Sequence, residues 1–424
     1  MTGRDGTTLI GVNAGITLAQ IGSYIYLPIL IPILGADFGG FWAGFVIFLT
    51  YVGRLLSTFF YEGLIARFAN RNTVIAGVLV EAVAIGLMGF ASGIPIFSVL
   101  AFFVGFGSGM SFPGLKNILG KFPEQDRPKA FSSFQMAYQL GLLGGAMLGG
   151  LFVGVDLRVL FSVVFALFLG YCLVAFSLIP ADPAERIPRT GTPLFSIAVL
   201  RGLRIGGGTR YFLLSSVYWM LAATFFVSMP LHMAAYVPHW SPSVPFWIAG
   251  LTLLILQYPL FGFMNRRFAP ALLMAIGFGA ICVADLLFGA GRTALWVVIG
   301  AIVVVLGDIL FTPSFDVWVS GKMAAERLAK AMGAMHFFRS FGNMVGSLTA
   351  GLLFEVALRA GIPGLNWYVA GAVALACALF CAAGTTKNIA ARRRPSKRFA
   401  TAAVRASDRS ITTGIQRSRP ARRM

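Results

Sequence analysis

The sequence predicts an all-α membrane protein with twelve transmembrane helices in two pseudo-symmetric bundles of six. Three observations support this prediction. Of the 424 residues, 58% are hydrophobic and only 12% are charged, and soluble domains carry roughly twice that share of charge. Apolar stretches long enough to cross a bilayer recur about twelve times along the chain. The first and second halves of the chain also match each other at a fixed offset.

Each predicted span contains about 20 apolar residues, the length that a membrane helix needs. The spans are bounded by charged residues or by clusters of Gly and Pro. A soluble fold of this apolarity would have no polar coat, so lipid must surround the chain. The predicted spans are 8–34, 40–62, 73–93, 95–120, 129–153, 157–180, 209–236, 243–264, 271–290, 294–320, 330–357 and 365–384.

The first apolar stretch is too long for a cleavable signal peptide, so we expect it to be the first membrane helix. All four cysteines fall inside predicted spans, at Cys172, Cys282, Cys377 and Cys381. We expect buried thiols, with no disulfide, no metal site and no cofactor.

Basic residues are concentrated in one of the two sets of predicted loops. Positive residues remain on the cytoplasmic side, so we expect a multi-pass inner-membrane protein with both termini in the cytoplasm. An even number of spans likewise places both termini on the same side of the membrane. The opposite loops contain only Arg158, Arg292 and Arg359. The basic set comprises Arg67, Arg71, Lys121, Arg127, Lys129, Arg186, Arg189, Arg201, Arg204, Arg210, Arg266, Arg267, Lys322, Arg327 and Lys330.

The C-terminal tail is strongly basic. From Lys387 to Met424 it contains twelve Lys or Arg and one acid, Asp408. A basic tail can bind nucleic acid, but beside a last membrane helix we interpret it as a disordered cytoplasmic segment near anionic lipid. We therefore expect a lipid bilayer and no nucleic acid among its partners.

An internal repeat divides the chain into two six-helix bundles. The predicted units are residues 1–180, a cytoplasmic linker at 181–208, a second bundle at 209–385 and the tail at 386–424. Two parallel six-helix repeats are the layout of the major facilitator transporters. At an offset of 200 the matched pairs are Arg67 with Arg267, Phe68 with Phe268, Gly77 with Gly277, Gly107 with Gly307, Pro113 with Pro313 and Arg127 with Arg327.

Glycines cluster at matching places in the two halves. Helices in lipid gain little hydrophobic energy by touching, so close backbone approach must supply the attraction. We interpret the glycines as faces for helix packing and as a sliding or rocking contact between the halves. The motif comprises Gly141, Gly145, Gly149 and Gly150 in the first half and Gly342, Gly346 and Gly351 in the second.

The first of these glycine runs resembles the antiporter motif G-x-x-x-G-P-x-x-G-G of drug-proton antiporters in the major facilitator superfamily, with Ala146 at the proline position. The order of the motifs is most similar to the MdtH-like multidrug branch. This resemblance implies a major facilitator fold that exports small organic molecules by alternating access, coupled to protons. It also implies that helices one, four, seven and ten line a central cavity.

A second motif, G-x-L-A-D-R-x-G-R-R between the family's helices two and three, is present in altered form. Glu62, Ala66 and Ala69 replace its first glycine, its aspartate and its second glycine, while Arg67 and Arg71 remain. The resemblance therefore implies a gating loop without the acid that normally pairs with its arginines. The gating-loop candidates of the two halves are Arg67, Arg71, Arg266 and Arg267.

Two further departures concern proton coupling. The family's coupling arginine on the fourth helix would lie near Phe102 or Phe103, and neither is basic. The first span, 8–34, contains no acid. Other groups must therefore carry any coupled proton.

Ionisable residues inside spans are costly, at roughly 3 kcal/mol each near the bilayer centre, and they usually face a cavity. Asp308 lies near the middle of the tenth span, and Asp316 follows about 80° round the same helix. Lys116 occupies the repeat position that matches Asp316. Alternatively, Lys116 and Asp316 are solvated at the cytoplasmic end or paired with each other, and Glu81 and His336 are packing residues. The proton-coupling candidates are Asp308, Asp316, Lys116, His336 and Glu81.

Polar and aromatic residues on the lining helices are candidates for the substrate cavity. Arg54 and Arg339 lie near the middle of helices two and eleven, and they either face substrate or brace glycine-rich helices by bonding backbone carbonyls. Alternatively, the aromatic candidates lie at the membrane–water interface, where Trp and Tyr are enriched. The cavity candidates are Gln20, Tyr24, Tyr218, Trp219, Arg54 and Arg339.

Three functions are compatible with the sequence. The first is proton-coupled efflux of small organic molecules by a monomer. The second, motivated by Arg54, Lys116 and Arg339, is transport of an anionic metabolite or siderophore. The third is a membrane receptor or scaffold that transports nothing. We expect no enzyme, because no set of catalytic groups and no nucleotide-binding motif is present in the sequence.

Overall fold

The computed structural model describes residues 3–181, 193–195, 209–322 and 325–393. Within these ranges all regular secondary structure is helical. The N-terminal half comprises α1 (Gly3–Phe38), α2 (Gly40–Met88), α3 (Ile94–Gly120), α4 (Arg127–Gly149), the short 3-10 helix η1 (Gly150–Phe152) and α5 (Leu157–Leu178). The C-terminal half comprises α7 (Thr209–Tyr236), α8 (Val244–Arg267), α9 (Pro270–Ala290), α10 (Ala294–Lys322), α11 (Ala325–Arg359) and α12 (Leu365–Arg393).

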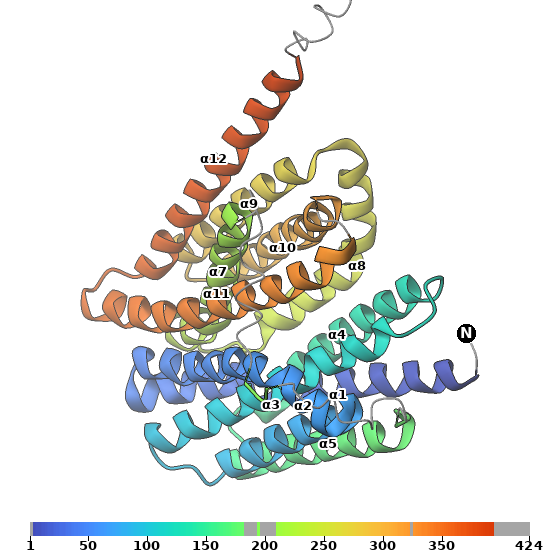
Figure 1. Cartoon of the computed structure of the whole chain (residues 1–424). Helices are drawn as coiled ribbons and strands as arrows, with labels where there is room; N and C mark the ends of the chain where they lie inside the picture. The colour runs from blue at the N-terminus through green and yellow to red at the C-terminus, as the bar shows by residue number, and fades with distance from the viewer. Residues whose placement is uncertain (1–2, 182–192, 196–208, 323–324, 394–424) are drawn as a thin grey trace, which may run out of the picture.

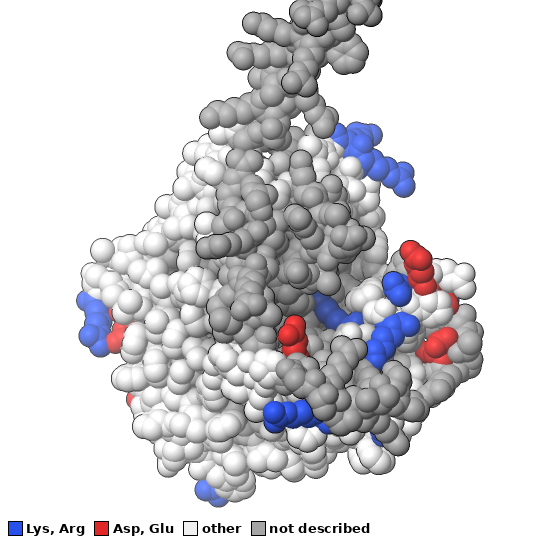
Figure 2. Space-filling view, viewed as in Figure 1, with Lys and Arg blue, Asp and Glu red and all other residues white. Residues whose placement is uncertain are grey.

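Ten of the described helices are long and apolar enough to cross a membrane, and α4 is the long helix that is missing from that set. Polar residues of α4 form hydrogen bonds with α1. The Asn13 amide donates to the Ser133 hydroxyl at 2.5 Å, and the Thr17 hydroxyl donates to the Ala137 carbonyl at 3.1 Å. Figure 2 shows a largely uncharged surface, with several charged side chains gathered where the α3–α4 connection lies.

The predicted spans 40–62 and 73–93 lie in the two arms of α2, which are two helical segments that meet at a kink. The 49 residues of α2 would extend about 74 Å as a straight helix, more than twice the thickness of a hydrocarbon core. The helix bends at Ala69, which has φ 64° and ψ 160°. One residue with non-helical dihedrals therefore replaces the loop that the sequence predicts.

The helices of each half pack mainly on one another, and the halves meet through α2 with α11, α4 with α8 and α1 with α7 (Figure 1). One end of the bundle contains the α1–α2 turn at Gly39, and the opposite end contains the bend at Ala69. Near the Gly39 end, Tyr24, Leu142 and Ala146 share a buried apolar cluster with Phe225 and Phe246. This cluster joins the halves toward the Gly39 end.

The internal repeat has a counterpart in the packing of the backbone. Gly77 of α2 faces Gly107 of α3 so closely that a Cβ on either would touch the other's carbonyl oxygen, and Gly277 of α9 faces Gly307 of α10 in the same way. These two crossings are separated by the 200-residue offset of the repeat.

The glycine runs pack mostly within each half. Gly141 and Gly145 lie against α1 at Thr17 and Ile21, and Gly342 and Gly346 lie against α7 at Ser216 and Met220. Contacts between halves come only from the ends of the runs. A Cβ on Gly149 would lie 3.2 Å from the hydroxyl of Ser243, the residue before α8, and one on Gly150 would lie 3.7 Å from the hydroxyl of Ser241. Gly351 lies against Gly40 and Gly44 of α2. A sliding contact between halves is thus limited to these last positions.

The two polar segments of the chain are only partly described. In the linker predicted at 181–208, Pro193 and Leu194 lie against Gly63 of α2, and Phe195 contacts Phe59 and Phe60. α12 continues to Arg393, past the predicted start of the tail at residue 386. The remainder of the tail lies outside the described residues.

Candidate functional site

Asp308 lies near the middle of α10, and its half-buried carboxylate is held by two hydroxyl groups. Tyr218 of α7 donates to Oδ1 at 2.5 Å, and Thr312, one turn along α10, donates to the same oxygen at 2.7 Å. No Lys or Arg that the structure describes lies within ion-pair distance of it. Within the described residues, the carboxylate is therefore fixed by neutral donors alone.

Tyr218 is not the open cavity wall that the sequence predicts. It is 2% exposed, and its ring stacks on Phe311 with centroids 3.9 Å apart. A buried tyrosine hydroxyl needs a partner, and here the partner is Asp308. Tyr218 therefore positions the carboxylate from within the core of the C-terminal half.

Three half-buried cations, from both halves, act electrostatically on His336 of α11. They are Lys116, Arg339 and Arg54. His336 also packs edge-on against Phe112 of α3, with ring centroids 6.4 Å apart. The structure thus gathers four predicted candidates from α2, α3 and α11 in one region.

Each of these cations contacts an aromatic ring. Arg54 lies 5.4 Å from the ring centroid of Tyr51, and its Nε donates to the Ser108 hydroxyl at 3.0 Å. Lys116 lies 4.8 Å from the centroid of Phe112. Arg339 lies 3.7 Å above Trp219 of α7. Trp219 therefore supports an arginine, which is a different role from forming an uncovered cavity wall.

Lys116 and Asp316 do not form the ion pair that their matched repeat positions suggest. They act on each other electrostatically, and within the described part of the chain neither side chain has an opposite charge within 4 Å. Asp316 is exposed, whereas Lys116 is half-buried. The two groups come from different halves, so the packing of the halves determines how far apart they lie.

A cavity of about 70 Å³ lies between α1 and α2 of one half and α7 and α8 of the other. Among the predicted cavity residues, Tyr24 lines it, and Gln20 lies one turn earlier on α1 beside Gly141. The lining residues are Tyr24, Leu27, Pro28, Ile31, Ile47, Tyr51, Phe226, Val227 and Phe246.

Two buried acids lie inside the halves, away from this cavity. Glu81, 5% exposed, lies at the crossing of α2 and α3 beside Gly107. Asp285, 4% exposed, lies beside Gly371 of α12. The Glu81 carboxyl group is thus enclosed by helices of the N-terminal half, and its role in proton coupling stays a prediction.

The gating-loop candidates are not brought together. Arg71 donates to the Phe176 carbonyl of α5 and lies 4.7 Å from that residue's ring centroid. Arg67 and Arg266 are exposed, and Arg267, also exposed, lies over Phe263 of its own helix. Arg71 therefore ties the bend of α2 to α5 and takes no acidic partner from the loop.

Sequence reasoning missed several residues that the structure places at these sites. Thr312 and Tyr51 lie one turn from Asp308 and Arg54, so helical spacing was an available signal. Ser108 and Glu355 contact residues far away in the chain, and no local pattern identifies them. No group of His, Cys, Asp and Glu in the described part of the chain could hold a metal ion.

Comparison with known proteins gives a consistent result. Residues 12–347 match the family model of the Major Facilitator Superfamily. An uncharacterized MFS-type transporter, YttB of Bacillus subtilis, is 23% identical over 74% of this chain and 79% of its own length. The multidrug resistance protein MdtH of Shigella dysenteriae is 24% identical over 78% of this chain and 82% of its own length.

Solved structures have the same fold. The nucleoside transporter NupG superposes with a TM-score of 0.74 at 16% identity, over 89% of this chain and 99% of that one. The human organic anion transporter MFSD10 superposes with a TM-score of 0.65 at 16% identity, over 90% of this chain and all of that one. The predicted fold class is thus confirmed. The chain belongs to the Major Facilitator Superfamily and is a membrane transporter rather than an enzyme.

Proposed function

We propose that this transporter exports small organic molecules across the inner membrane in exchange for protons, with Asp308 as the proton carrier. The observation that carries the proposal is the Asp308 carboxylate, held at mid-helix by Tyr218 and Thr312, with no described Lys or Arg within ion-pair distance. The export direction is supported by the antiporter-like glycine run and by relatives named multidrug resistance proteins.

The proposed orientation has both termini in the cytoplasm. The Ala69 end carries Arg67, Arg71, Arg266 and Arg267, and positive residues are retained on the cytoplasmic side. The Gly39 end then faces outward. Since the buried cluster joins the halves toward the Gly39 end, the described conformation would be closed to the outside. Rocking of one half against the other would open it.

In this proposal, coupling depends on how the surroundings of the Asp308 carboxyl group change during the transport cycle. A carboxylate inside a membrane protein is stabilised by hydrogen-bond donors when charged and by burial when neutral. Opening the site to either side changes its access to water, so the balance between the two forms changes during the cycle. Substrate binding would then be linked to proton release.

The test is transport into proteoliposomes whose lumen is made acidic. Three fluorescent solutes of different charge serve as probes: ethidium, a neutral coumarin and fluorescein. We expect wild-type protein to accumulate at least one probe in a manner that a protonophore abolishes. Asp308→Asn should lose this accumulation and retain exchange of the same probe between two equal pools.

Asp285→Asn is the matched control, because it makes the same change in a buried acid inside the C-terminal half. It should accumulate the probe as wild type does. Gradient-driven accumulation by Asp308→Asn at the wild-type level would show that Asp308 does not carry the proton.

A further inference from the structure

We infer that the substrate is an organic anion whose charged head is bound by Arg54 and Arg339 and whose apolar body enters the cavity lined by Tyr24 and Tyr51. The inference rests on the proposed transport function for its biological meaning, but anion binding is measurable without any gradient. Its basis is the set of unused hydrogen-bond donors that the two halves present to one region.

The two guanidinium groups have most of their donors free. Arg54 uses only Nε, in its bond to Ser108, so both terminal nitrogens make no hydrogen bond within the described residues. Arg339 has its Cζ 3.7 Å from the ring centroid of Trp219, and its guanidinium makes no hydrogen bond within the described residues. A planar fork of N–H donors matches the two oxygens of a carboxylate.

The alternative role for these arginines was to brace the glycine-rich helices. Bracing requires a bond from a guanidinium to a backbone carbonyl, and neither Arg54 nor Arg339 makes one in the described structure. The carbonyl of Arg339 itself accepts from the Asn343 side chain at 3.0 Å, so the helix there is supported by another residue. The arginine side chains remain available for a ligand.

Nearby acids do not neutralise the arginines by direct contact. Asp308 is held by two hydroxyls, and Asp316 is exposed and acts on Lys116 and Arg339 only at a distance. Glu81 acts on Arg54 from within the N-terminal half. Among the described residues, no carboxylate lies within 4 Å of Arg54, Arg339 or Lys116. An anionic ligand would supply the missing partner.

The arrangement also indicates where the rest of the ligand lies. Arg54 is next to Tyr51, and Tyr51 lines the cavity together with Tyr24, Phe226 and Phe246. Both Tyr24 and Tyr51 are acted on by Arg54 and Arg339. If the charged group of the ligand binds Arg54 and Arg339, an aromatic or aliphatic group attached to it therefore lies against these rings. Because Arg54 and Arg339 belong to different halves, a bound head also links the halves.

The test compares acids with amides of the same shape. Purified protein in detergent is titrated with benzoate, 1-naphthoate and hexanoate, and with benzamide, 1-naphthamide and hexanamide, while thermal unfolding is followed. A ligand that binds the folded state raises the unfolding temperature. We expect at least one carboxylate to raise it and the matching amide to have no effect. Arg54→Gln and Arg339→Gln should each weaken the binding by at least about tenfold.

Arg292→Gln is the control, because Arg292 is an exposed cation over Tyr236, outside the cavity, and should bind the carboxylate as wild type does. Arg339→Lys should bind it more weakly than wild type and better than Arg339→Gln. Equal binding of acid and amide, failure of all three carboxylates to bind, or wild-type binding by both glutamine variants would overturn the inference.

The outcomes separate this inference from the proposed function. Carboxylate binding without proton-driven transport would support the anion site and contradict the coupling proposal. Proton-driven transport of ethidium or of the coumarin, with no carboxylate binding, would support export and contradict the anion site.

Discussion

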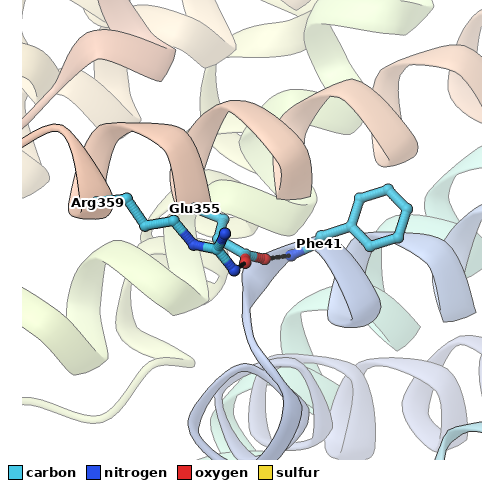
Figure 3. Close-up of polar contacts among 3 residues, drawn as sticks. All are labelled: Phe41, Glu355 and Arg359. Carbon is cyan, nitrogen blue, oxygen red and sulfur yellow. Dashed lines mark hydrogen bonds and ion pairs between the residues drawn. The ribbon is translucent and has the colours of Figure 1, made fainter.

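The carboxylate of Glu355, on α11, accepts a hydrogen bond at 2.8 Å from the backbone N–H of Phe41, at the start of α2 (Figure 3). Its other oxygen is paired with Arg359. The first N–H groups of a helix have no partner within the helix, and the helix dipole favours a negative charge there. This bond joins a side chain of one half to the backbone of the other. It therefore persists only while the Gly39 end stays closed.

Glu355→Gln should weaken this closure, because the amide keeps the shape of the side chain and loses its charge. A charge at a helix N-terminus contributes about 1 kcal/mol, which corresponds to roughly fivefold in the equilibrium between closed and open states. The measurement is the rate at which a maleimide labels Ile47→Cys, in a background without the four native cysteines. We expect labelling to accelerate several-fold.

Arg359→Gln is the matched control for Glu355. It removes the exposed partner of the carboxylate and leaves the bond to Phe41 intact, so the labelling rate should change little. If the two variants label at the same rate, the contact with α2 does not control closure.

Gly145→Leu or Gly346→Leu should abolish transport while the protein still inserts in the membrane. A side chain at Gly145 would collide with the Ile21 backbone of α1, and one at Gly346 with the Met220 carbonyl of α7. Transport and membrane content are measured together. Gly262→Leu is the control, because nothing lies within 4 Å of a Cβ there. Full activity with leucine at both positions would show that close packing is not required.

Ala69→Gly should stabilise the protein. Ala69 has φ 64° and ψ 160°, a combination that is nearly restricted to glycine and that costs about 1–3 kcal/mol in other residues. Glycine occurs at this place in the motif that the sequence resembles. The unfolding temperature in detergent is the measurement, and we expect it to rise.

Ala66→Gly provides the comparison for Ala69, since residue 66 is helical. Glycine inside a helix destabilises by about 0.5–1 kcal/mol, so this variant should unfold at a lower temperature. Equal effects of the two substitutions would argue against strain at Ala69.

Lys116 and Asp316 are expected to pair when the Ala69 end closes, although they are apart in the described conformation. Lys116→Asp and Asp316→Lys should each reduce transport, because each places like charges opposite one another. The double variant restores opposite charges and should recover part of the activity. Transport rates of the four proteins form the measurement. A double variant no better than the worse single variant would exclude the pairing.

The sequence alone predicted the parts of this protein that depend on local composition. Apolar runs of about 20 residues identify membrane helices, and the structure places helices at all twelve predicted spans, with two of them joined in α2. The offset of 200 between Gly77 and Gly277, and between Gly107 and Gly307, predicted the repeat because close backbone crossings require glycine at fixed positions. Asp308 was noticeable because an acid in an apolar helix is costly.

Only the tertiary structure decided which of these residues meet. Tyr218 and Asp308 are 90 positions apart, Arg54 and Ser108 are 54 apart, and Phe41 and Glu355 are 314 apart. Helical periodicity describes one helix at a time and carries no information on which helix lies opposite. It therefore named Tyr218 only as a cavity candidate and left the pairing of Lys116 with Asp316 as one of several interpretations. The rotation of each helix about its axis follows from packing among all its neighbours, and that packing sets Arg54 beside Tyr51 and Arg339 over Trp219.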